Sequence, residues 1–409
     1  MQKEKSSLKL FWCLFFIYTM NTFTKIAFSA VTAAMIKDGV LTKTQAGTVS
    51  GIFWFVYAMG QFVGGSLASR HPIALLKLSL IGGGVANLLM AFSNSYIPIL
   101  IIWSSNGILQ MGLWPSVLYL LTNYIVPQQR GKSLTYIAYC YGIGSILSHI
   151  CTAVVLTHFS WNVVFIWCAM MSFISVIPVF YIKRTLIPQL SEGIKMPKAE
   201  KREKEHLGKG FVWKSGLMFF CTLLLIKSFT ETGIKTWMPT ILMESHGVSP
   251  SFTSVLSVVL LVLNLFGVSI GAMIYRKLRE NEVNTLLFQY LTVVPLMALL
   301  LGFRSMNVYV LTIIFSLITV MLYGSGQVMG MYYPSRFQKV GGVAFIGGVL
   351  NCFAALGNVI ASYLNGLIAD LYGWDITIIV WNGAIIFFVL VTLILMPTWK
   401  KFRKEQGIR

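Results

Sequence analysis

Long apolar runs separated by short polar stretches make up most of the chain from residue 8 onward. Twelve runs have about 20 residues or more, enough for a helix rising 1.5 Å per residue to cross about 30 Å of hydrocarbon. None alternates like a membrane-spanning strand, so their backbone groups must be hydrogen-bonded within helices. The pattern predicts an all-α polytopic membrane protein with twelve transmembrane helices. They are expected near 8–36, 45–68, 73–93, 96–124, 133–157, 161–182, 213–242, 251–275, 284–303, 306–332, 341–369 and 375–397.

One long hydrophilic stretch, "KRTLIPQLSEGIKMPKAEKREKEHLGKG", divides six spans from six. Its mixture of Lys and Glu is typical of a solvated, partly helical linker. The sequence therefore predicts an N-terminal half over 1–182, a cytoplasmic linker over 183–212 and a C-terminal half over 213–409. The first span is too long for a signal-peptide core and is expected to remain as the first helix.

The two halves repeat each other in three places. "DGVLTKTQAG" after the first span matches "HGVSPSFTSV" after the seventh, and "GSLASR" after the second matches "GAMIYR" after the eighth. "QMGLWPS" in the fourth span matches "VMGMYYPS" in the tenth. The three matches keep the same order and nearly the same offset. Parallel six-helix repeats predict pseudo-symmetric halves, a binding site near the midplane between them, and alternating access.

Over its whole length the chain resembles the major facilitator superfamily. "QMGLWP", "PQQRG" at 127–131 and "LYGWD" at 371–375 are similar to the organophosphate:phosphate antiporter branch. "YAMGQFVGG", which contains Tyr57 and Gln61, resembles the anion:cation symporters of sugar acids and similar anions. The resemblance implies the major facilitator fold and secondary transport.

Composition agrees with a membrane protein, because 56% of residues are apolar and only 11% are charged. The net charge of +19 raises the question of nucleic acid. Of the 32 Lys and Arg residues, however, only Lys37, Lys43 and Arg304 fall outside if both termini are cytoplasmic, and three lie within spans. The positive-inside rule accounts for this asymmetry. We expect a multi-pass protein of the inner or plasma membrane, monomeric in its bilayer and without a nucleic-acid partner.

Four charged residues interrupt the spans. Lys25 lies in the first, and Lys227, Glu231 and Lys235 lie in the seventh at intervals of four, which puts those three on one helix face. A charge at the bilayer centre costs about 3 kcal/mol on insertion scales. Lys25 is about eleven residues, or ~16 Å, from the outer end, beyond the reach of a snorkelling stem. Three positive charges and one negative charge predict attraction of an anion.

The resemblance suggests roles for these residues, because helices 1, 4, 7 and 10 line the cavity in this superfamily. Lys25 falls where the organophosphate branch has its helix 1 substrate arginine. That branch's helix 7 arginine falls at Glu231, with opposite charge, and its helix 5 histidine falls at Tyr141. Lys227 and Lys235, one turn either side, can supply the missing cation.

Each candidate has a structural alternative. Glu231 can pair with a lysine merely to neutralise a polar seam. His149 can relay protons, but a satisfied core histidine is the favoured interpretation. Seven neutral residues can bind the hydroxyl groups of a ligand or make interhelical hydrogen bonds instead. They are Tyr57, Gln61, Asn106, Gln110, Tyr141, Tyr323 and Gln327.

The sequence predicts a secondary active transporter of a small organic anion, such as a sugar phosphate, sugar acid or similar carboxylate. Proton-coupled uptake with Glu231 as the proton-coupling residue is the favoured mode, and exchange against phosphate is the second. A non-transporting membrane sensor of such an anion is the rival, which the short terminal segments disfavour. The chain has no GxxxxGK[ST] loop, HExxH motif or CxxC spacing, so we expect no ATPase or other enzyme activity, no cofactor and no metal.

Overall fold

The structure is a computed structural model. It describes residues 2–191, 215–336 and 343–405, except 69, 127, 130–132, 134, 135 and 138. Within these residues the chain is helical and contains no strand. This confirms the predicted all-α membrane fold. Most of the predicted linker, 183–212, lies outside the described residues, so its expected partial helicity stays a prediction.

The chain divides into two compact units. Unit 1 comprises Met1–Lys201 and Ser249–Val258, and unit 2 comprises Arg202–Val248 and Val259–Arg409. Helix α13 contributes its first residues to unit 1 and the rest to unit 2.

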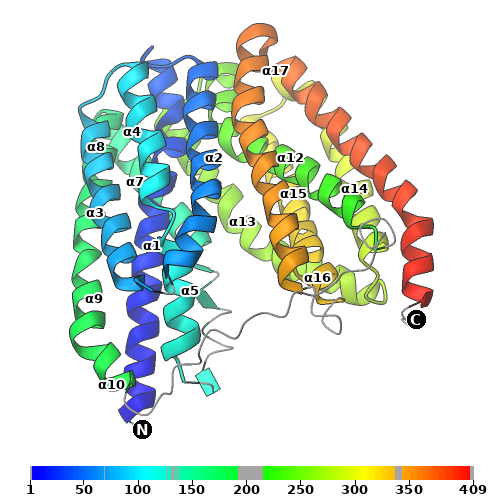
Figure 1. Cartoon of the computed structure of the whole chain (residues 1–409). Coiled ribbons are helices and arrows are strands. Elements are labelled where there is room, and N and C mark those ends of the chain that lie inside the picture. Colours follow the sequence, from blue (N-terminus) through cyan, green and yellow to red (C-terminus); the bar gives the residue numbers. More distant parts are fainter. Residues whose placement is uncertain are drawn as a thin grey trace. The chain divides into compact units, whose positions relative to one another are not determined.

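Unit 1 is built from long helices that pack side by side (Figure 1), with α1 against α7 and α8, α2 against α4, and α3 against α8. A short π-helix at Ile182–Leu186 separates the last two helices. The helices are α1 Gln2–Lys37, α2 Lys43–Ala68, α3 Pro72–Ala91, α4 Tyr96–Leu109, α5 Leu113–Tyr124, α7 Tyr139–His158, α8 Trp161–Ile174, α9 Val176–Tyr181 and α10 Ile187–Ser191.

Unit 2 packs α12 against α15 and α17, and α14 against α15 and α17. Helix α17 holds the last two predicted spans, which meet at Gly373, whose φ of 80° is non-helical. Among the described residues, eleven helical stretches are long and apolar enough to cross a membrane, and the longest, Ile346–Lys404, contains this pair. The helices are α12 Leu217–His246, α13 Pro250–Lys277, α14 Glu282–Leu299, α15 Val308–Gln327, α16 Tyr333–Ser335 and α17 Val343–Glu405.

The fourth and tenth spans are present but irregular, which the sequence prediction did not include. The span at 96–124 breaks between α4 and α5, three residues before Pro115. In the tenth span a short π-helix at Val328–Tyr332 precedes Pro334. A proline lacks the N–H for its i−4 hydrogen bond, and its ring crowds that carbonyl group. The repeated "QMGLWPS" and "VMGMYYPS" segments therefore share a proline-induced irregularity.

Glycines give the other two repeats a common structure. Gly39 and Gly247, which follow α1 and α12, have left-handed φ angles of 71° and 66°, as expected at helix C-termini. In the second repeat the close approach is shifted by one residue. A Cβ atom at Gly64 of α2, just before the aligned Gly65, would lie 2.5 Å from the carbonyl oxygen of Met111, and one at Gly271 of α13 would lie 2.7 Å from the Cα of Gly324. Both helices thus use a glycine to approach the irregular helix of their own unit.

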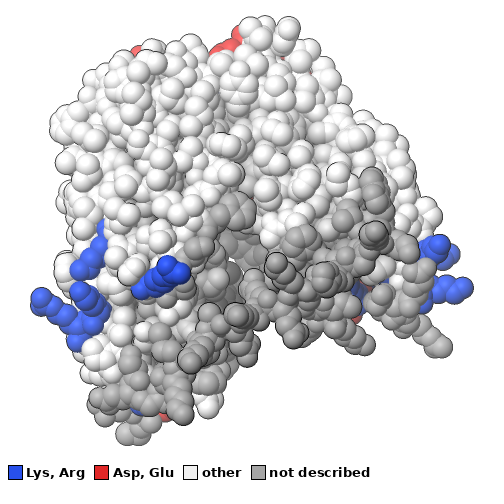
Figure 2. Space-filling view, viewed as in Figure 1, with Lys and Arg blue, Asp and Glu red and all other residues white. Residues whose placement is uncertain are grey.

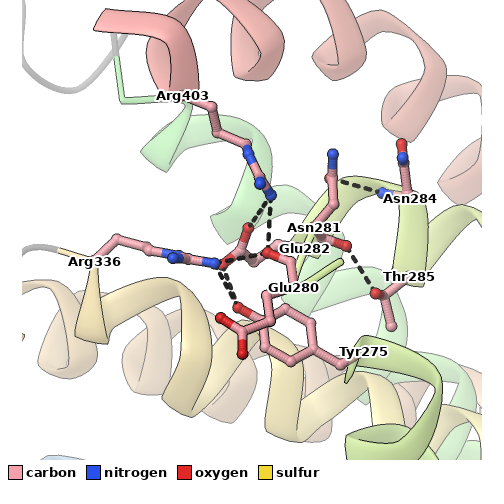
Figure 3. Close-up of polar contacts among 8 residues, drawn as sticks. All are labelled: Tyr275, Glu280, Asn281, Glu282, Asn284, Thr285, Arg336 and Arg403. Carbon is pink, nitrogen blue, oxygen red and sulfur yellow. Dashed lines mark hydrogen bonds and ion pairs between the residues drawn. The ribbon is translucent and has the colours of Figure 1, made fainter. Parts of the chain in front are cut away.

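A buried ionic cluster joins helix ends in unit 2 (Figure 3). The fully buried Glu282 carboxylate accepts from the Tyr275 hydroxyl at 2.8 Å and Arg336 Nε at 2.6 Å, with Arg403 Nη1 at 3.7 Å. The Glu280 carbonyl oxygen accepts from both arginines, at 2.6 and 2.8 Å. Glu280 has a φ of 52°, so these bonds stabilise a left-handed turn between α13 and α14.

Basic side chains are distributed unevenly within each unit. On the face shown in Figure 2, those of unit 1 lie toward the end that holds the N-terminus, and those of unit 2 toward the end that holds the C-terminus. This agrees with the asymmetry expected from the positive-inside rule.

Candidate functional site

The ammonium group of Lys25 is enclosed by aromatic rings. Lys25 lies on α1 and is only 4% exposed. Its Nζ atom lies 4.6 Å from the ring centroid of Tyr57, 5.5 Å from that of Trp54 and 5.9 Å from that of Tyr141. Among the described residues no carboxylate forms an ion pair with it. The charge is therefore held by ring faces from α2 and α7.

A chain of buried amides lies one helical turn before Lys25. Asn21 Nδ2 donates to Gln110 Oε1, and Gln110 Nε2 donates to Asn106 Oδ1 at 3.1 Å. All three side chains are at most 3% exposed. Gln110 therefore has protein partners at the α4–α5 break. This matches the alternative in which such residues make interhelical hydrogen bonds and do not bind a ligand. Its role, and that of Asn106, in ligand binding stays a prediction.

Close packing of α4 on α2 fixes the rings around Lys25. A Cβ atom at Gly107 would lie only 2.8 Å from the Phe53 carbonyl oxygen and 3.4 Å from the Tyr57 nitrogen. One turn earlier on α4, Trp103 stacks on Phe53 at 5.3 Å between centroids. The stretch of α2 that carries the rings thus packs against both the backbone and the side chains of α4.

In unit 2, Glu231 pairs with two lysines at once. Lys227 and Lys235, one turn before and after it on α12, both contact its carboxylate. The three side chains are 13%, 8% and 23% exposed in chain order. The spacing of four predicted a single stripe, and the structure confirms it. With all three groups ionised, the stripe has a net charge of about +1.

Two residues of helix α15, Tyr323 and Gly326, adjoin the lysines of this stripe. The Lys235 Nζ atom lies 4.6 Å from the centroid of the Tyr323 ring. A Cβ atom at Gly326 would lie 2.8 Å from Lys227 Nζ, so the glycine leaves room for the ammonium group. The buried Oε1 atom of Gln327 accepts no hydrogen bond from the described residues. The stripe beside α15 is therefore cationic and partly exposed, and α15 also carries a buried acceptor without a described donor.

Helix α17 sets the position of α12 from the other side. Thr232 Oγ1 donates to Asn358 Oδ1 at 2.7 Å. A Cβ atom at Gly233 would lie 2.6 Å from Asn365 Nδ2, and Asn365 in turn accepts from Trp381 Nε1 at 3.0 Å. These contacts flank Glu231 in sequence and restrict rotation of α12, which would turn the stripe away from α15.

The structure groups most predicted residues within their own units. Lys25, Tyr57 and Tyr141 come together in unit 1, and the α12 stripe meets Tyr323 of α15 in unit 2. Gln61 lies half-buried one turn after Tyr57. His149 is buried with Nδ1 3.0 Å from the Ser145 carbonyl oxygen, as in the core interpretation.

Sequence reasoning missed two neighbours of Lys25. Trp54 precedes Tyr57 by three residues and so shares a helix face with it, a signal that was available. Asn21 precedes Lys25 by four, but its partner Gln110 lies on another helix, and nothing local indicates that pairing.

Several known proteins are similar in sequence. The membrane sensor protein UhpC of Salmonella typhimurium is 27% identical over 36% of this chain and 33% of its own length. A probable hexose phosphate transport protein of Chlamydia muridarum is 24% identical over 49% of this chain and 43% of its own. The hexuronate transporter of Bacillus subtilis is 23% identical over 90% of both chains. The matches thus span less than half of the first two relatives and nearly all of the third.

Solved structures and the family comparison agree on the architecture. The inward-facing, unoccupied structure of a bacterial homologue of the human lysosomal transporter Spinster superposes with a TM-score of 0.74. That match covers 97% of this chain and 98% of the other at 15% identity, and it shows the fold alone. The family model described as Major Facilitator Superfamily matches residues 10–347. The chain belongs to the major facilitator superfamily.

Proposed function

We propose that the protein is a secondary transporter of a small organic anion, that Lys25 and the α12 lysines bind the anion, and that Glu231 couples its movement to protons. The observation that carries the proposal is the double pairing of Glu231 with Lys227 and Lys235. A carboxylate between two ammonium groups occupies the donors that an anionic substrate would need. Lys25, by contrast, is a buried cation without a described carboxylate partner.

Protonation of Glu231 provides the coupling. While ionised, the carboxylate competes with the substrate for both lysines. Once protonated, it loses most of its attraction for them, and the ammonium groups can bind the incoming anion. Protonation and anion binding then favour each other, which is the linkage that proton–anion symport requires.

The substrate class follows from charge and from the relatives. The candidate lysines of both units suit a carboxylate or phosphate group. Two relatives bear the names of hexose phosphate and hexuronate transport proteins, and both of those substrates are sugars with an anionic group. We therefore propose a sugar phosphate, a sugar acid or a similar carboxylate. The protein would act in the cell membrane with both termini in the cytoplasm.

The proposal is tested by Glu231→Gln in proteoliposomes. The variant mimics the protonated state, so it should bind the anion and exchange it across the membrane. It should lose accumulation driven by a pH gradient. Glu244→Gln is the matched control, because Glu244 lies on the same helix and accepts a hydrogen bond from Trp374 Nε1, which the amide oxygen can replace. The control should accumulate substrate like the wild type.

The same assay separates the rival functions. Full pH-driven accumulation by Glu231→Gln would make Glu231 a structural partner of the lysines and favour exchange against phosphate. The UhpC relative favours a sensor as the second candidate. A sensor would bind the anion without net flux in the wild-type protein, so the absence of wild-type uptake despite binding would replace the transport proposal.

A further inference from the structure

The two units hold their candidate lysines by different chemistry. In unit 2 the ammonium groups contact a carboxylate, whereas in unit 1 three aromatic rings take its place around Lys25. We propose that Trp54 is a positioning residue whose ring, with that of Tyr57, holds the Lys25 ammonium ready for the carboxylate or phosphate group of the substrate. This inference rests on the proposed role of Lys25 in anion binding.

An aromatic ring stabilises a cation without neutralising it. The face of the ring has a negative quadrupole potential, which attracts an ammonium group within about 6 Å, but it carries no net charge. A counter-carboxylate would bring a full negative charge that repels an incoming anion. The aromatic enclosure therefore lowers the cost of burying Lys25 while its positive charge remains available to the substrate.

The indole ring of Trp54 is held in place by its own neighbours. It makes edge contacts with Phe53, at 5.2 Å and 81°, and with Tyr57, at 5.8 Å and 85°. Phe53 in turn stacks on Trp103, and Gly107 lets the α4 backbone approach. A ring fixed in this way restricts the positions open to a long lysine side chain, which reduces the rotamer entropy lost on binding.

If Trp54 acted only through its shape, anion affinity would not depend on the electron density of its ring. Replacement by tryptophans with one, two and three ring fluorines weakens the ring quadrupole progressively and changes the shape little. Affinities of the full-length protein for glucuronate and for glucose 6-phosphate are measured at each step. We expect affinity for the bound probe to fall stepwise, by about fivefold across the series. Trp54→Leu should lose at least as much, and Trp54→Phe should recover part of it.

The control is the same fluorine series at Trp399 of α17, which is 1% exposed and packs on Phe220, Tyr333 and Phe402, none of them a candidate residue. It should leave affinity unchanged. A flat series at Trp54 would overturn the inference while the loss of binding in Lys25→Ala upheld the proposed function. Retained binding in Lys25→Ala would instead overturn the role of Lys25.

A second measurement needs no ligand and applies even when neither probe binds. In protein labelled with ¹³Cε-lysine, the Lys25 signal is assigned from its absence in Lys25→Arg. Ring currents should move its ε-methylene proton resonance upfield of exposed lysines, and Trp54→Leu should move it back. An unshifted resonance in the wild type, or one that Trp54→Leu leaves unchanged, would contradict the enclosure.

Discussion

Lys25 and Lys235 each lie 4.6 Å from the centroid of a tyrosine ring, Tyr57 in unit 1 and Tyr323 in unit 2. The difference between them is the carboxylate of Glu231, which contacts Lys235. A substrate that binds Lys235 must displace this internal partner, whereas one that binds Lys25 need not. Protonation should therefore affect substrate binding mainly at α12. Lys25 should contribute to affinity at any pH at which it stays charged.

Removal of the Lys25 charge tests that role directly. Lys25→Ala should weaken anion binding by about 10- to 100-fold, the range of a lost charge-assisted hydrogen bond. Lys25→Arg should retain part of the affinity, because it keeps the charge. The measurement is equilibrium binding of the sugar anion to purified protein.

Lys77→Ala is the matched control for Lys25→Ala. Lys77 also lies over a ring in unit 1, 3.9 Å from the centroid of Phe180, but on α3 and away from the candidate residues. Its loss should leave affinity unchanged. A folded Lys25→Ala protein that binds like the wild type would remove Lys25 from the site.

At the scale of helices, single glycines decide how closely the supporting helices approach the candidate residues. Gly107 places α4 against the ring-bearing stretch of α2, and Gly233 places α12 against Asn365 of α17. Neither glycine has a side chain that could bind the substrate. Their substitution should act through helix position.

Gly107→Ala should therefore lower anion affinity by about tenfold, because its Cβ atom would lie 2.8 Å from a backbone oxygen that cannot move without α2. Gly65→Ala on α2 is the control, since its Cβ atom meets no heavy atom within 4 Å. Binding and thermal unfolding are measured on both. Equal affinities would show that α2 adjusts without moving the rings.

The elements differ in how far the sequence predicts them. The positions of the spans and the Lys227–Glu231–Lys235 stripe follow from periodicity or from spacing within one helix. The segments around Gly39 and Gly247 were matched as a repeat, but their left-handed turns were not predicted. The irregularity of the fourth span was predictable from Pro115 but was missed. The pairing of Asn21 with Gln110 was not predictable, because it depends on packing between separate helices.

At the scale of the whole chain, the predicted membrane topology accounts for the net charge of +19. Basic residues concentrate in the segments that the alternation of spans assigns to one side, and the visible ones of each unit lie toward the end with its chain terminus (Figure 2). The buried Glu282 cluster adds two further arginines, Arg336 and Arg403, of which Arg403 lies in the last turn of α17 (Figure 3). The positive-inside rule predicts that these segments face the cytoplasm.

Orientation can be tested with single cysteines in a chain whose six native cysteines are replaced by serine. Asp38→Cys lies in the exposed turn after α1, which the topology places outside, and Glu192→Cys lies in the predicted cytoplasmic linker. An impermeant thiol reagent applied to intact cells should label Asp38→Cys and leave Glu192→Cys unlabelled, because only the first is outside the membrane barrier. Permeabilised cells should show labelling of both, which controls for thiol reactivity. Labelling of Glu192→Cys in intact cells, with Asp38→Cys protected, would invert the topology and place the basic segments outside.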